Sequence, residues 1–142
     1  MCLHVVDEVP TTNRKTGYKV FRTTESPYST VPLPKGAVRS QFIRDHQLYV
    51  EGSWYNSTEG TITSNVFGIS TDVRYPKGFH IFLTKQSAQI WADGGYKLSV
   101  HRVAFKEVVA SGIILHRYDS RSRESQKRVV VARQMKVLER VS

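Results

Sequence analysis

The chain has 142 residues, of which 39% are hydrophobic and 11% aromatic, and its formal net charge is +9. This length and composition predict one folded domain, residues 1–142, and are not typical of a disordered chain. No apolar run approaches the roughly 20 residues of a membrane helix, the N-terminus is acidic where a secretory signal is basic, and the single cysteine excludes an internal disulfide, so we expect an intracellular protein.

The first half of the chain favours short strands separated by polar loops. Residues 3–6 are a candidate strand, and residues 17–22 alternate between apolar and polar types as a half-buried strand does. Residues 23–36 contain three prolines and predict an extended loop. Residues 37–55 favour two short strands, and residues 61–70 are again typical of a strand.

The clearest local pattern follows in the middle of the chain. A turn at residues 76–78 precedes a predicted strand at residues 79–83. Thr84 is a suitable N-cap, because its hydroxyl can accept a hydrogen bond from an amide of the first turn, and it predicts a helix over residues 85–93. The apolar stripe of this helix consists of Ala88, Trp91 and Ala92.

A long strand is predicted over residues 96–105. Its apolar residues change from even to odd positions after Val100, so we expect a β-bulge near residues 101–102. Gly112 is expected to interrupt the β-prone segment that follows.

The C-terminal part predicts a hairpin with a basic tip. Residues 113–118 and 128–132 are β-prone and flank the polar run 119–127, and residues 134–141 form a last alternating segment. The predicted fold class is therefore α+β: a mostly antiparallel β-sheet with one short helix, about residues 85–93, packed on it.

The positive charge of the chain is concentrated around this hairpin. Residues 97–142 hold eleven Lys and Arg against four Asp and Glu, whereas residues 1–96 hold ten against eight. The planar guanidinium group of arginine fits phosphate oxygens, and a tyrosine ring can stack on a base. The hairpin therefore predicts an anionic ligand. A solvated loop whose charge serves solubility is the simpler alternative. The candidate ligand-binding residues are Arg117, Tyr118, Arg121, Arg123, Lys127 and Arg128, with Tyr75, Lys77, His80 and Arg102 from other segments.

The sequence carries no motif for catalysis or metal binding. It lacks a Walker loop, a Rossmann fingerprint, a nucleophile elbow and any His or Cys spacing typical of zinc sites. We therefore expect a binding protein with no catalytic residues, metal or cofactor. The aromatic residues of the central segment are expected mostly in the core, with one or two lining a pocket in which a ring stacks: Tyr49, Trp54, Tyr55, Phe67 and Tyr75.

Residues 75–92, with residues 1–4 and 17–21, resemble small proteins encoded by bacteriophages and prophages. Residues 103–112 and 129–138 are similar to the C-terminal strands of these proteins. The resemblance implies a non-enzymatic protein of the host cell cytoplasm that counters host defence, most directly by sequestering a nucleotide or cyclic-oligonucleotide immune signal.

Three alternatives to this function stay open. The protein is an inhibitor that binds an acidic surface of a host protein, an accessory protein that binds nucleic acid, or an ADP-ribosyltransferase-like enzyme, for which His101 and Glu107 are the nearest candidates. No membrane partner is expected. The strand edges of a small β-rich chain favour a homodimer or a higher homo-oligomer.

Overall fold

A computed structural model describes residues 3–10, 12, 14–26, 28–41, 47–66, 69–93, 95, 97–115 and 126–142. These residues form mostly antiparallel β-sheet and one short helix, which confirms the predicted class, and the helix has the predicted bounds. The elements are β1 (Val5–Val6), β2 (Thr16–Arg22), β3 (Ala37–Ser40), β4 (Leu48–Val50), β5 (Trp54–Asn56), β6 (Thr61–Val66), β7 (Ile69–Pro76), β8 (Phe79–Phe82), α1 (Lys85–Asp93), β9 (Leu98–Leu115) and β10 (Gln126–Arg140).

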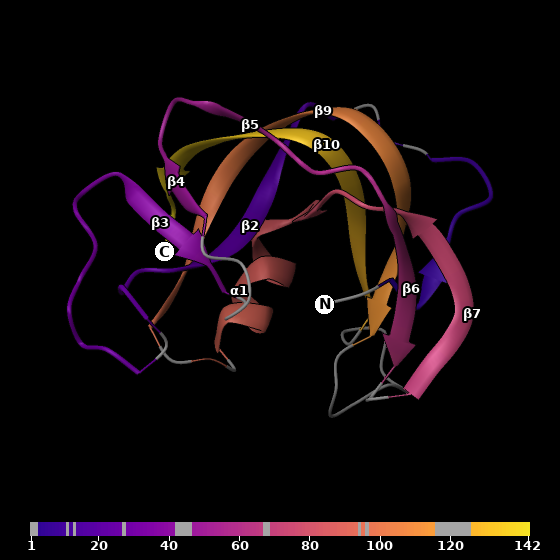
Figure 1. Ribbon diagram of the computed structural model, residues 1–142, viewed down its shortest axis with the longest axis horizontal. Coiled ribbons are helices and arrows are strands. Elements are labelled where there is room, and N and C mark those ends of the chain that lie inside the picture. The colour runs from indigo at the N-terminus through magenta and orange to yellow at the C-terminus, as the bar shows by residue number, and fades with distance from the viewer. Residues whose placement is uncertain are drawn as a thin grey trace.

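Two long antiparallel strands, β9 and β10, arch across the whole molecule and organise the main sheet (Figure 1). β9 pairs with β10 and also with β2 and β1, while β10 pairs with β8 and β5. β8 meets β2 at the pair Tyr18 and Phe82, so the sheet closes on itself through β9, β10, β8 and β2. β3 and β4 extend the sheet from β2 at one end of the arch, and β6 and β7 form a separate two-stranded sheet at the other.

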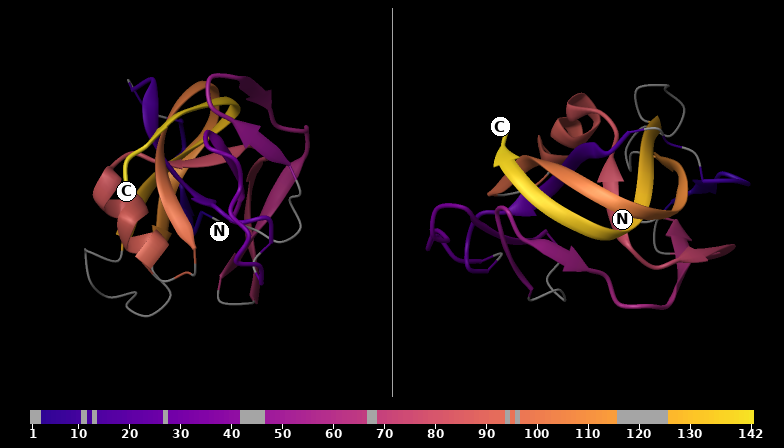
Figure 2. Two further views of the ribbon diagram at one scale, coloured as in Figure 1. Left: turned by 90° about the vertical axis from the view of Figure 1, so that its left-hand side faces the viewer. Right: turned by 90° about the horizontal axis from the view of Figure 1, so that it is seen from above.

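Both faces of the main sheet are covered in its central part. One core cluster contains Val20 of β2 and Ala88 of α1, and the other contains Phe21 of β2 and Tyr49 of β4. Figure 2 shows, in its right-hand view, α1 on one side of β9 and β10 and the β4–β6 segment on the other. Successive residues of one strand are therefore both buried, as in a sheet with two packed faces.

The apolar residues of β9 change from even to odd positions after Val100, but the cause is not the predicted bulge in this strand. β2 pairs with β9 without interruption from Leu98 to Ala104. Val100 belongs to the core cluster under α1 and Val103 to the cluster under β4, so the change reflects two covered faces. The irregularity at this level lies in β10, between Val137 and Glu139.

Gly112 does not interrupt β9, which continues unbroken to Leu115, and β10 likewise joins two segments that the sequence predicts as separate strands. Gly112 pairs with Val6 of β1. A Cβ atom at position 112 would lie 1.9 Å from the carbonyl oxygen of Val5, so glycine is what allows β1 to approach.

The helix is formed and placed as its sequence predicts. The Thr84 hydroxyl accepts a hydrogen bond from the Ser87 amide at 3.2 Å, which is the expected cap. Ala88 and Ala92 are buried and Trp91 packs against the same core cluster. In the described part of the chain, no helix has the length and apolar composition needed to cross a membrane.

Candidate ligand-binding site

The predicted basic hairpin is present, but its tip lies outside the described residues. β9 and β10 pair as far as Leu115 and Gln126. The candidates Arg117, Tyr118, Arg121 and Arg123 belong to residues 116–125, which the structure does not describe. Their contact with an anionic ligand stays a prediction.

The described basic candidates of β9 and β10 are engaged within the protein. Lys127 is only 2% exposed and is not without a partner, so its side chain is not open at the surface. The Arg128 Nη2 atom lies 2.5 Å from Asp7 Oδ2, and Arg102 Nε lies 3.0 Å from Glu139 Oε1. Exposed ion pairs contribute about 0–1 kcal/mol, so both arginines can exchange these partners at low cost.

Tyr75 and His80, two further candidates, form a buried pair. The Tyr75 hydroxyl accepts a hydrogen bond from the Leu3 amide at 2.9 Å and lies 2.8 Å from His80 Nε2. Which of the two atoms donates depends on the tautomer of the His80 ring. Burial, together with the nearby Lys19 ammonium, lowers the pKa of His80 to about 3. Lys77, in contrast, is exposed beside this pair.

His101 and Glu107 do not form an acid–base pair. His101 is 3% exposed, and its Nδ1 atom lies 3.3 Å from Ser99 Oγ. Burial, followed by the charge of Arg140, lowers the pKa of His101 to about 4. His101 borders a cavity of about 500 Å³, whereas the exposed Glu107 borders a different one.

An exposed tryptophan lies on the sheet where β5, β10 and β9 run side by side. Trp54 pairs with Lys136, and Lys136 pairs with Ala104, so these side chains form one row on the same face. The next row is Asn56, Gln134 and Lys106. We call the six residues of these two rows the Trp54 face. The residues between the rows belong to the core on the other face: Tyr55, Phe105 and Met135.

Two ammonium groups lie against the Trp54 ring. Lys106 Nζ is 4.2 Å from the ring centroid and Lys136 Nζ is 5.0 Å from it. Neither lysine takes part in the ion pairs formed among the described residues. Trp54 as a residue is 38% exposed, so solvent reaches it beside the two cations.

A cavity of about 590 Å³ opens next to the Trp54 ring. Arg14 and Lys15, from the segment before β2, line it together with Lys106 and Glu107 of β9. The Arg14 Nη1 atom donates a hydrogen bond to the Leu83 carbonyl oxygen at 2.5 Å, which holds the guanidinium in place. The cavity has the size of a small-molecule site, and its charged lining has three cations and one carboxylate.

Sequence reasoning did not find this combination. Trp54 is one of five aromatic residues considered for a stacking pocket, but its lysine neighbours are about 50 and 80 positions away along the chain. The register of β5 on β10, and of β10 on β9, is what places the three side chains together.

Comparison with known proteins adds no relative. No family model, curated protein or solved structure matches the chain. The resemblance to phage-encoded proteins therefore stays a prediction.

Among the described residues, no group of three His, Cys, Asp or Glu side chains is arranged to hold a metal ion.

Proposed function

We propose that the protein is a non-enzymatic binding protein whose ligand carries both an aromatic base and phosphate, and that this ligand binds on the Trp54 face. The observation that carries the proposal is the exposed Trp54 ring with Lys106 Nζ at 4.2 Å and Lys136 Nζ at 5.0 Å from its centroid. A tryptophan ring stacks on any base, and ammonium groups bind phosphate oxygens.

The contacts on Trp54 can be exchanged for those of a ligand. A base that stacks on the ring displaces one ammonium, which costs about 0.5–1 kcal/mol for an exposed cation–π contact. Stacking contributes about 1–3 kcal/mol per base, and the displaced ammonium gains the phosphate of the same ligand. The arrangement therefore favours a ligand that has both groups close together.

The ligand class that fits is a nucleotide or a short single-stranded oligonucleotide. Its bases expose their flat faces, which a duplex hides within the stack. Arg14 and Lys15 extend the positive lining along the adjacent cavity, so further phosphates have partners there. The use of such binding against a host immune signal is part of the same proposal and rests on the resemblance to phage-encoded proteins.

The test is a titration of fluorescein-labelled single-stranded oligothymidylate and of a labelled cyclic dinucleotide, followed by fluorescence anisotropy. Substitution Trp54→Ala is expected to weaken binding roughly 5- to 150-fold, because it removes the stacking contribution of about 1–3 kcal/mol. A folded wild-type protein that binds neither ligand would overturn the proposal.

The salt dependence of binding tests the lysines separately. The double variant Lys106→Gln/Lys136→Gln is expected to flatten the plot of log K against log salt by about 1.4, since each phosphate neutralised on a single strand contributes about 0.7. The variant Lys35→Gln/Lys85→Gln removes the same charge from exposed positions away from Trp54 and is the matched control. Binding that survives Trp54→Ala and is lost in Arg121→Gln/Arg123→Gln would place the ligand at the hairpin tip instead.

A further inference from the structure

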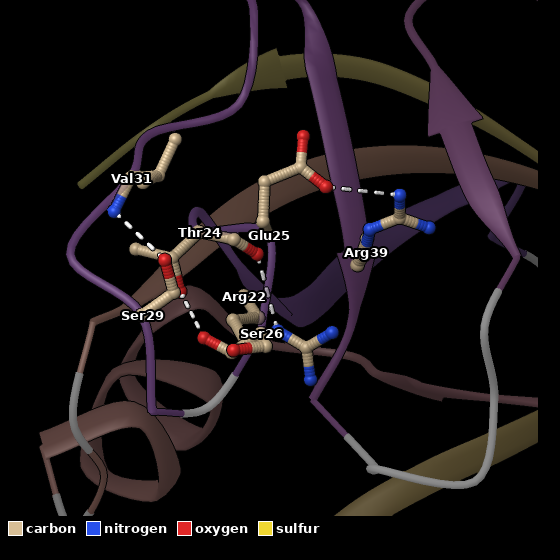
Figure 3. Close-up of polar contacts among 7 residues, drawn as sticks. All are labelled: Arg22, Thr24, Glu25, Ser26, Ser29, Val31 and Arg39. Carbon is tan, nitrogen blue, oxygen red and sulfur yellow. Dashed lines mark hydrogen bonds and ion pairs between the residues drawn. The ribbon is translucent and has the colours of Figure 1, made fainter.

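Two arginines lie side by side on neighbouring strands at the end of β2. Arg22 pairs directly with Arg39 of β3, so their side chains share one face of the sheet, and Figure 3 shows the two guanidinium groups close together. Arg39 Nη2 lies 3.2 Å from Glu25 Oε2. Arg22 Nε donates to the Thr24 carbonyl oxygen at 3.2 Å.

The guanidinium of Arg22 is buried with an incomplete set of partners. Arg22 is 4% exposed, and its Nη1 atom is buried without a hydrogen-bond acceptor. A buried cation is costly unless it is paired. Buried side-chain donors without an acceptor are rare in folded proteins. The neighbouring charge increases the cost: burial and then Arg39 lower the pKa of Arg22, and Glu25 opposes this only in part.

A second unpaired donor lies on the same face. The side-chain oxygen of Gln41 accepts a hydrogen bond from Trp91 Nε1 of α1 at 3.0 Å, while its Nε2 atom is buried without an acceptor. Gln41 follows the last residue of β3, Ser40, and its hydrogen bond with Trp91 places its side chain on the side of the sheet that α1 covers. Val20 of β2 shares a core cluster with Ala88 of α1, and Arg22 lies on the same face of β2 two residues later. Arg22 and Gln41 therefore both lie on the α1 side of the β2–β3 edge.

We infer that Arg22 and Gln41 bind one oxyanion, the phosphate or carboxylate group of a ligand, in the space between α1 and the β2–β3 edge. The guanidinium offers Nη1 to one oxygen and the Gln41 amide offers Nε2 to another. The anion also offsets the repulsion between Arg22 and Arg39. This site is distinct from the Trp54 face: Thr16 of β2 pairs with Ala104 of that face, and Arg22 is six residues further, about 20 Å along the strand.

The test is thermal unfolding in a chloride buffer with added inorganic phosphate or acetate at matched ionic strength. Wild-type protein is expected to gain roughly 3–6 °C in Tm at saturating phosphate. A response to phosphate alone assigns a phosphate group, and a response to both anions assigns oxyanions in general. The gain is expected to vanish in Arg22→Met and to persist in the control Arg133→Gln, which removes an equal charge from β10.

The variant Gln41→Glu keeps the inference testable if Arg22→Met fails to fold. Its carboxylate supplies the missing anion from within the chain and retains an acceptor for Trp91 Nε1. It is therefore expected to unfold at a higher temperature than wild type without phosphate, and to lose the response to phosphate. A wild-type Tm that neither anion raises, or an equal loss of the response in Arg133→Gln, would overturn the inference.

Discussion

At the scale of single residues, Tyr75 joins parts of the chain that are far apart in sequence. Its hydroxyl accepts from the Leu3 amide at 2.9 Å, and Ser64 Oγ donates to the Leu3 carbonyl oxygen at 2.6 Å. The same hydroxyl lies 2.8 Å from His80 Nε2. The sequence analysis named both Tyr75 and His80 as candidate ligand contacts. Leu3 is 72 positions away, so its role as partner was not visible.

Substitution Tyr75→Phe is expected to lower the free energy of unfolding by about 1–3 kcal/mol, because it leaves the buried Leu3 amide and His80 Nε2 without partners while keeping the ring. Urea unfolding followed by circular dichroism measures the change. Tyr28 is 88% exposed, so Tyr28→Phe is the control and is expected to change nothing measurable. Equal stability of Tyr75→Phe and wild type would show that water satisfies both groups.

At the scale of elements, the helix was predicted with its bounds and cap, whereas β9 and β10 were predicted as fragments. A capped helix depends on neighbours three and four residues away, which the sequence displays. The continuity of a strand depends on what pairs with it: Gly112 looks like a break until β1 is placed against it. Alternation also fails as a guide where both faces of a strand are covered, as at Val100 and Val103.

Substitution Gly112→Ala is expected to displace β1, because its Cβ atom would lie 1.9 Å from the Val5 carbonyl oxygen. We expect a loss of at least 1–3 kcal/mol in the free energy of unfolding, the usual effect of overpacking. The informative comparison is a double-mutant cycle with a chain that lacks residues 1–6, in which the same substitution should cost much less. An undiminished cost in the shortened chain would refute the assigned role of Gly112.

At the scale of the whole molecule, the excess of Lys and Arg in residues 97–142 remains the main indication in the sequence of an anionic partner. In the fold, these side chains lie in different environments. Lys127 is buried, Arg128 is paired with Asp7, and Lys106 and Lys136 lie against Trp54. Along β9, Lys106 of the Trp54 face is separated from the last residue of the strand, Leu115, by about 30 Å. The positive charge of this third is therefore spread over several places in the fold.

The stability of the whole fold is expected to fall as the pH falls from 6.5 toward 4. The pKa values of His80 and His101 are lowered to about 3 and about 4, so the unfolded chain binds more protons than the folded one below pH 6.5. Each histidine is then expected to lower the free energy of unfolding by up to about 2 kcal/mol between pH 7.5 and pH 5.0. Urea unfolding at these two pH values measures the loss, and His80→Gln should reduce it; an unfolding free energy that does not change with pH would contradict the assignment.

The sequence by itself determined the α+β class, the helix at residues 85–93, the hairpin of the C-terminal third and the concentration of positive charge there. These features depend on periodicity, caps and composition, which are local properties of the chain. Only the tertiary structure decided that Tyr75, His80 and Lys127 are buried, that Trp54 meets Lys106 and Lys136, and that Arg22 lies beside Arg39. These contacts arise from strand register, which joins residues tens of positions apart and which no local pattern encodes.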